Sequence, residues 1–94
     1  MTTALFTHEE CLQHITPDGH SERAARLTEV LGALSGSEFE ALERRDAPLA
    51  EREDLLRVHP EAHIAAIEAA IPEEGRVALD PDTHVMKHSL KAAL

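Results

Sequence analysis

One short segment concentrates side chains that could do chemistry. Residues 19–27 read Gly-His-Ser-Glu-Arg-Ala-Ala-Arg-Leu, a pattern typical of a turn followed by a helix start. Ser21 can cap that helix, and Glu22 lies favourably near the positive end of its dipole. Arg23 and Arg26 are three residues apart and share one helical face. Arg26 borders the apolar stripe, so its guanidinium could point into something other than water, although a solvated arginine with its stem on the core is the commoner arrangement.

Metal binding is the next chemistry to consider, because the chain contains seven histidines. His59 and His63 are four residues apart, as are His84 and His88, and such pairs can share a helical face. A mononuclear zinc site requires three or four ligands, however, and Pro60 interrupts the first pair. Structural histidines are therefore the favoured interpretation. A looser cluster could form in the first loop, from His8, Cys11, His14 and His20.

Two aspartates in a predicted loop are a further candidate site. Asp80 and Asp82 could bind a cation or accept hydrogen bonds from the amides of a ligand, but turn-forming aspartates are commoner. The chain has no glycine-rich phosphate loop, nucleophile elbow or His-Glu-x-x-His motif. Cys11 lacks a recognisable activating partner and is interpreted as a structural thiol. The residue pattern alone therefore predicts no complete active site.

Size and charge limit the classes of function. The 94 residues predict one small domain, 1–94, of marginal stability. Eighteen acidic against nine basic residues leave a formal charge of −9, and no basic patch is visible, so a nucleic-acid partner is not expected. One cysteine excludes an internal disulfide and a cysteine-based zinc cluster. No apolar run is long enough for a membrane span or signal peptide, so no membrane partner and a cytoplasmic location are expected.

Helices must position most of these residues. Alanine and leucine supply most of the 43% hydrophobic content, and Phe6 and Phe39 are the only aromatic residues, which favours helix over sheet. Apolar spacing predicts helices over residues 21–34, 50–58 and 60–71, where Pro60 can occupy a first helical position.

Short strands and loops fill the remainder. Residues 3–7 and 77–79 are β-compatible, and a short strand is plausible within 39–47 before Pro48. Residues 7–18 and 80–83 read as loops. Ser89 is interpreted as the cap of a helix that runs for about one turn, too short for an isolated helix, so we expect an interrupted element there.

Four segments of the chain, taken together and in order, resemble segments of a known protein family. They are residues 7–14 (Thr-His-Glu-Glu-Cys-Leu-Gln-His), 19–27, 55–63 (Leu-Leu-Arg-Val-His-Pro-Glu-Ala-His), and 79–83 with 88–94 (Leu-Asp-Pro-Asp-Thr and His-Ser-Leu-Lys-Ala-Ala-Leu). Together they resemble the N-terminal part of the class II-like histone deacetylase family, which includes bacterial hydrolases of acetyl-lysine and acetylpolyamines. Ser21 and Ala24 depart from prolines common in that family, and His63 and His84 stand at positions that are often aromatic.

The resemblance implies a fold and two site residues. The family has an α/β arginase-like fold with a parallel sheet, so this chain would be its N-terminal fragment, mostly α with one to three short strands. Arg26 matches an arginine that lines the internal channel below the active site. Asp82 matches a rim aspartate that accepts hydrogen bonds from substrate backbone amides. His20, Glu22, Arg23 and His59 match positions interpreted as scaffold.

The resemblance also implies what this chain does not supply. The family's paired general-base histidines, its Asp/His/Asp zinc ligands and its transition-state tyrosine would all lie beyond residue 94. The chain is therefore expected to bind no cofactor, zinc being that of the full-length family, and to be inactive alone. Without most of its sheet it should expose an apolar face and form a homo-oligomer. The alternatives are an enzyme completed by a second chain, a small binding or regulatory module that docks on a full-length deacetylase, and a histidine-based metal-binding protein.

Overall fold

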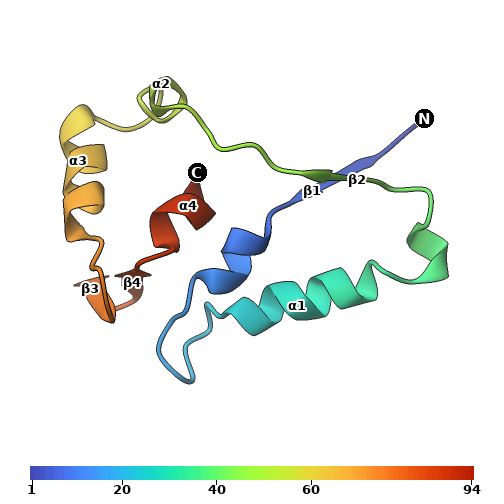
Figure 1. The fold of residues 1–94 in the computed structure, drawn as a ribbon, viewed down its shortest axis with the longest axis horizontal. Helices are drawn as coiled ribbons and strands as arrows, with labels where there is room; N and C mark the ends of the chain where they lie inside the picture. The colour runs from blue at the N-terminus through green and yellow to red at the C-terminus, as the bar shows by residue number, and fades with distance from the viewer.

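The computed structural model describes all 94 residues, and it contains both helices and strands (Figure 1). The helices are α1 (Ala24–Ala33), α2 (Arg52–Leu55), α3 (Glu61–Ala70) and α4 (Ser89–Ala93), with two 3-10 helices, η1 (Glu9–Gln13) and η2 (Ser37–Phe39). The strands are β1 (Ala4–Thr7), β2 (Glu43–Asp46), β3 (Arg76–Asp80) and β4 (Thr83–Met86). The four strands form two sheets, so the chain is a small mixed α/β domain, with one strand more than predicted.

The three predicted helices are present but shorter than the apolar spacing indicated. α1 begins three residues late, because His20 Nδ1 accepts a hydrogen bond from the Glu22 amide and holds the preceding residues in a turn. α3 starts after Pro60 and ends before Ile71, which is extended, as expected for a residue that precedes a proline.

α2 is a single turn where residues 50–58 were predicted to be helical, so that prediction is wrong in length. The Asp54 carboxylate accepts the Glu51 amide at 3.1 Å, and the Asp54 amide donates to the Glu51 carbonyl at 3.0 Å, which fixes the helix start at Arg52. A proline at position 60 disfavours the α-conformation at residue 59, so the helix cannot continue into α3.

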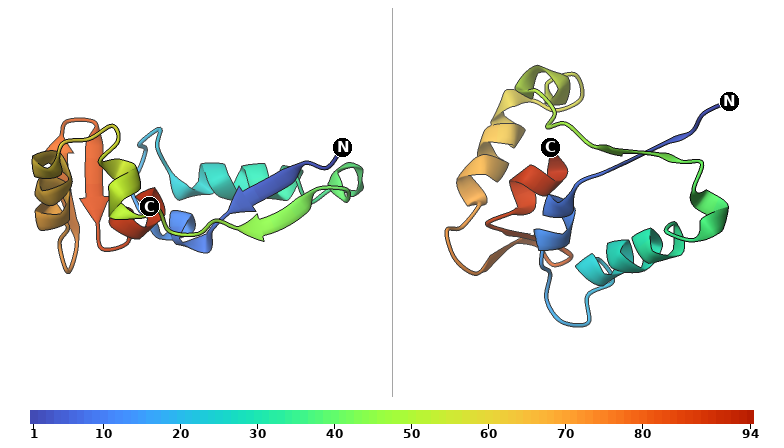
Figure 2. Two further views of the ribbon diagram at one scale, coloured as in Figure 1. Left: turned by 90° about the horizontal axis from the view of Figure 1, so that it is seen from above. Right: turned by 45° about the vertical axis from the view of Figure 1, so that its right-hand side comes forward.

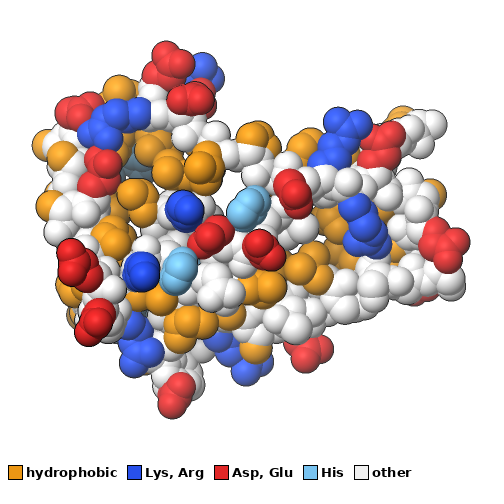
Figure 3. Space-filling model, viewed as in Figure 1, with side chains coloured by type: hydrophobic (Ala, Val, Ile, Leu, Met, Phe, Trp, Pro, Cys, Tyr) orange, Lys and Arg blue, Asp and Glu red, His pale blue; other side chains and the backbone are white.

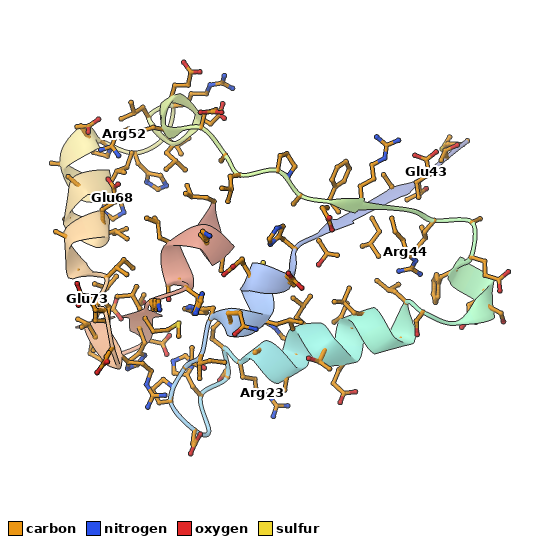
Figure 4. The ribbon with its side chains drawn as sticks, viewed as in Figure 1. Arg23, Glu43, Arg44, Arg52, Glu68 and Glu73 are labelled. Atoms are coloured by element: carbon orange, nitrogen blue, oxygen red, sulfur yellow. The ribbon has the colours of Figure 1, made fainter.

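β1 and β2 form a parallel two-stranded ribbon, and both strands were predicted. Ala4 pairs with Glu43 at one end of the ribbon and Thr7 with Asp46 at the other. The outer edge of each strand is unpaired, and all of β2 is exposed. Figure 2 shows the ribbon at the end of the molecule away from α3. The Arg44 guanidinium donates to the Leu34 carbonyl and ties β2 to the chain just after α1. Figure 4 labels Arg44 between β2 and α1.

β3 and β4 form an antiparallel hairpin. The predicted strand at residues 77–79 lies within β3, whereas β4 was not predicted. The predicted loop 80–83 is correct only for the two connecting residues, Pro81 and Asp82. A register irregularity between Ala78 and Asp80 accompanies the turn. β4 was missed because only two of its four residues are apolar and only Val85 among them is fully buried.

The core is very small. Only Ile64 and Val85 are buried apolar residues, beside the buried polar residues Thr16 and Ser89. The accessible surface is 7096 Å², against about 5,400 Å² expected for a compact monomer of this mass. The radius of gyration is 15.5 Å, against about 12 Å expected. The chain is therefore an open arrangement of elements.

Large apolar side chains accordingly reach the surface in several places (Figure 3). Val58 is 78% exposed, Phe6 on β1 is 55% exposed and Leu49 is 54% exposed. No helix combines the length and the apolar character that crossing a membrane requires.

Candidate functional site

A cleft of about 580 Å³ lies between the loop before α1 and the β3–β4 hairpin, and α3 and α4 complete its walls. We call it the central cleft. It is lined by His14, Thr16, His20, Ser21, Glu22, Arg26, Ile67, Ile71, Leu79, Asp82, Thr83, His84, Val85, Ser89, Leu90 and Ala93. Arg26 and Asp82, the two site residues predicted from the sequence, are distant along the chain and both line this one cleft.

Asp82 projects from the hairpin turn at the edge of the cleft, and its side chain is 96% exposed. Its backbone amide donates to Asp80 Oδ1 at 2.8 Å. Its carbonyl oxygen and its carboxylate Oδ1 lie 3.0 and 3.2 Å from His20 Nε2. The backbone of Asp82 is thus held on both sides, while most of its carboxylate stays open to solvent and can accept hydrogen bonds.

The same turn perturbs Asp80. The pKa of this carboxyl is lowered, first by the hydrogen bond from the Asp82 amide and then by the Thr83 hydroxyl, and desolvation opposes this only in part. Asp80 therefore acts as the turn-forming aspartate of the pair, and Asp82 is the one available to a ligand.

Arg26 lines the same cleft from the first turn of α1. Its Nη2 lies 3.3 Å from Glu22 Oε2, and the Arg26 side chain is 65% exposed. The resemblance placed this arginine in an internal channel, whereas here it borders an open cleft. An exposed ion pair of this kind contributes little to stability, so the guanidinium can exchange Glu22 for another anion at low cost.

Partly buried polar contacts join segments that surround the cleft. His14 Nδ1 lies 2.7 Å from Ser89 Oγ, which also accepts the Met86 amide at 2.8 Å. Arg76 Nη1 donates to the Thr16 carbonyl at 3.3 Å. The prediction that Ser89 caps α4 is wrong: His88 occupies the cap position, and Ser89 is the first helical residue, with its hydroxyl turned to the hairpin and to His14.

His20 is the site residue that sequence reasoning missed, since it was interpreted as scaffold. Its Nδ1 accepts the Glu22 amide at 3.0 Å, so Nε2 carries the proton that it donates to Asp82. A signal for the contact with the Glu22 amide, though not for the contact with Asp82, was present in the sequence. His8 is also followed two residues later by a glutamate, and its Nδ1 accepts the Glu10 amide at 3.2 Å in the same way.

The histidines are dispersed over different contacts. The His59 and His63 rings lie 5.2 Å apart, without a third ligand. His84 packs edge-on against His20 at 5.5 Å and has a buried Nδ1 without a hydrogen-bond partner, while His88 Nδ1 lies 3.1 Å from Glu10 Oε2. In the first loop, the Cys11 thiol donates to the Ala92 carbonyl at 3.7 Å and does not face the histidines as a ligand set.

No group of three or more histidine, cysteine, aspartate or glutamate side chains converges anywhere in the chain. A zinc ion bound by protein side chains needs at least three such donors. The residues present therefore do not fit the zinc that the resembled family uses.

Comparison with protein-family models gives no match to this sequence, and comparison with curated proteins gives none either. The likeness to deacetylases therefore stays a prediction from the four sequence segments and the residues they contain.

Proposed function

We propose that residues 1–94 are the N-terminal segment of a zinc-dependent deacetylase of the acetyl-lysine or acetylpolyamine type. In this proposal the segment supplies ligand-binding side chains and is inactive alone. The observation that carries it is the meeting of Arg26 and Asp82 at one cleft, because the sequence resemblance singled out these two residues independently.

The chemistry of the two residues suits an amide-bearing ligand. An exposed carboxylate at the edge of a cleft accepts N–H donors, and a guanidinium that lines the same cleft binds a carboxylate such as acetate. His20 and Asp80 hold the backbone around Asp82, so its carboxylate needs little ordering when a ligand binds.

The open architecture supports the proposal, because it leaves surface that further polypeptide could cover. Parallel strands occur almost only in sheets covered on both faces, yet the β1–β2 ribbon has two unpaired edges and an exposed face. The accessible surface exceeds that of a compact monomer by about 1,700 Å², roughly twice what one partner contributes to an interface of standard size. An isolated chain would bury this surface in a homo-oligomer.

Hydrolysis needs a metal to polarise the amide and activate water, and the residues present do not fit one. The purified chain should therefore retain no tightly bound zinc and should not deacetylate a fluorogenic acetyl-lysine peptide. Elemental analysis and the peptide assay measure the two properties, with a complete deacetylase as the positive control. One tightly held zinc together with turnover by this chain alone would contradict the proposal.

A binding experiment tests the other part of the proposal, that this segment supplies ligand-binding side chains. An N-acetyl-lysine peptide titrated into ¹⁵N-labelled chain should shift the amide signals around Arg26 and Asp82. Asp82→Asn should weaken binding, because an amide group presents only one acceptor oxygen and carries no charge. Asp18→Asn is the matched control, since Asp18 is exposed and does not line the central cleft. Equal weakening by both variants would count against the assignment of Asp82.

A further inference from the structure

The turn that carries Asp82 is exposed, yet its backbone is hydrogen-bonded on both sides. The Asp82 side chain is 96% exposed, whereas that of its partner His20 is only 16% exposed. Two backbone atoms of Asp82 are hydrogen-bonded, the amide nitrogen to Asp80 and the carbonyl oxygen to His20, and its Oδ1 lies 3.2 Å from His20 Nε2. The two hydrogen bonds fix the backbone of Asp82, and the His20 ring is the one side chain placed to limit the rotamers of its exposed carboxylate.

The imidazole that restrains Asp82 is itself fixed in place. His20 Nδ1 accepts the Glu22 amide at 3.0 Å, which leaves Nε2 as the N–H donor toward Asp82. The His84 ring stands nearly perpendicular to it, at a centroid distance of 5.5 Å. The Glu22 carboxylate is paired with Arg26 and is therefore engaged elsewhere. One tautomer of His20 satisfies both of its ring nitrogens.

We propose that His20 is a positioning residue for Asp82. Its Nε2–H donates to the carbonyl of Asp82 and lies 3.2 Å from Oδ1, close enough to orient the carboxylate, so that Oδ2 stays free at the edge of the central cleft to accept N–H donors of a peptide-like amide. Only the identity of that ligand rests on the proposed function. The restraint of Asp82 by His20 is a property of this chain, and it can be measured without any ligand.

Two substitutions separate the two contacts of the ring. His20→Gln keeps an N–H donor at about the reach of Nε2 and loses the acceptor for Glu22. His20→Asn keeps an acceptor near the Glu22 amide, but its side chain is too short to reach Asp82. In the unmodified chain, long-range ¹H–¹⁵N correlations identify the tautomer of His20, and Hα–Hβ couplings report the rotamer of Asp82.

The proposal expects the Nε2–H tautomer and a single Asp82 rotamer in the unmodified chain. The single rotamer should persist in His20→Gln and average in His20→Asn. If His20 acted only as the acceptor for the Glu22 amide, the Asp82 rotamer would instead average in His20→Gln and stay single in His20→Asn. An Nδ1–H tautomer in the unmodified chain, or a single Asp82 rotamer in His20→Asn, would overturn the proposal. The tautomer of His20 and the rotamer of Asp82 in the unmodified chain require no variant, so either can overturn the proposal even if a substituted chain fails to fold.

Ligand binding is a second measurement, and it tests the role of His20 separately from the proposed deacetylase function. For an N-acetyl-lysine peptide, His20→Asn should raise Kd roughly 2- to 10-fold, the range expected for one lost hydrogen bond, and His20→Gln should stay near the unmodified value. Unchanged affinity in His20→Asn would overturn the positioning role. If the unmodified chain does not bind the peptide, the deacetylase proposal fails, and the tautomer and rotamer results still decide the role of His20.

Discussion

Two histidines in this chain act on the backbone as asparagine usually does. His8 and His20 each use Nδ1 to accept the amide two residues later, at 3.2 and 3.0 Å. Only a neutral imidazole with its proton on Nε2 can accept at Nδ1. His8 thereby caps η1, and His20 holds the turn before α1 while its other nitrogen reaches Asp82. A single side chain thus joins local structure to a distant turn.

Asp80 should make the hairpin turn sensitive to acid. Its pKa is lowered in the folded chain, so the ionised carboxylate stabilises the fold. That contribution is fully present above the unfolded value of about 3.9 and is lost as the pH falls through the lower folded pKa. The protection factor of the Asp82 amide in hydrogen exchange, which corrects for the ordinary pH dependence of amide exchange, should therefore fall at the acid end of this window.

Asp80→Asn supplies the comparison. The variant cannot ionise, so protection of the Asp82 amide should be lower near neutral pH and nearly independent of pH below 5. Asp46→Asn is the control, since Asp46 lies in β2, outside this turn. An unchanged acid profile in Asp80→Asn would contradict the role of the ionised carboxylate.

Two glycines offer a matched pair for stability. Gly19 has φ +81°, and a Cβ there meets no atom within 4 Å, so conformation alone penalises a side chain. Gly19→Ala should lower the free energy of unfolding by about 1 kcal/mol. Gly32 lies in α1 with equal space, and Gly32→Ala should raise it by about 0.5–1 kcal/mol. Urea denaturation measures both, and a shift of the same sign in both variants would contradict the expectation.

At the scale of elements, the link between α2 and α3 depends on one side chain. The Arg52 guanidinium donates to Glu61 and, at 2.6 Å, to Glu68, and Figure 4 shows Arg52 beside Glu68. These carboxylates raise the pKa of Arg52 above its ordinary value, first through the Glu61 hydrogen bonds. Because α2 is a single turn, it relies on this link more than a long helix would.

Arg52→Lys should loosen α2 while leaving α3 nearly unchanged. A lysine carries the same charge but cannot bridge two carboxylates with a planar fork. Amide exchange in α2 should speed up, and global stability should change little, because the pair is exposed. Arg57→Lys is the control, since Arg57 makes one 3.3 Å contact with Asp54 within a single turn. Equal effects of both variants would show that the bridge between the helices does not matter.

At the scale of the whole molecule, exposed surface and charge act in opposite directions. The extra accessible surface favours association, whereas a charge of −9 on each copy opposes it. Leu5 and Thr7 on β1 are half-buried, and Ala4 and Phe6 alternate with them toward solvent. The face that carries Phe6 is thus the open face of an uncovered parallel ribbon, and we expect association there.

Self-association should therefore increase with protein concentration and with salt, which screens the repulsion between acidic copies. Sedimentation velocity measures this, and a monomer at every concentration and salt level would contradict it. Phe6→Ser should weaken association more than Leu49→Ser does. The two side chains are equally exposed, at 55% and 54%, but Leu49 lies outside the ribbon. A stronger effect at Leu49 would move the interface away from β1.

Much of the local structure follows from short-range patterns. Apolar spacing located α1 and α3, because helical periodicity is visible over ten residues. It overestimated α2, where a capping pair and a proline limit the helix to one turn. β4 has no such pattern, since its pairing with β3 depends on the turn between the two strands.

By itself, then, the sequence located the four α-helices, three of the four strands and the acidic charge, and its resemblance to a known family singled out Arg26 and Asp82. Only the tertiary structure decided that these two residues share a cleft, that β1 pairs with β2, and that Ser89 bonds His14 while His20 bonds Asp82. The physical reason is range. Periodicity and capping act within a few residues, whereas these contacts join distant segments through polar groups that leave no periodic signal along the chain.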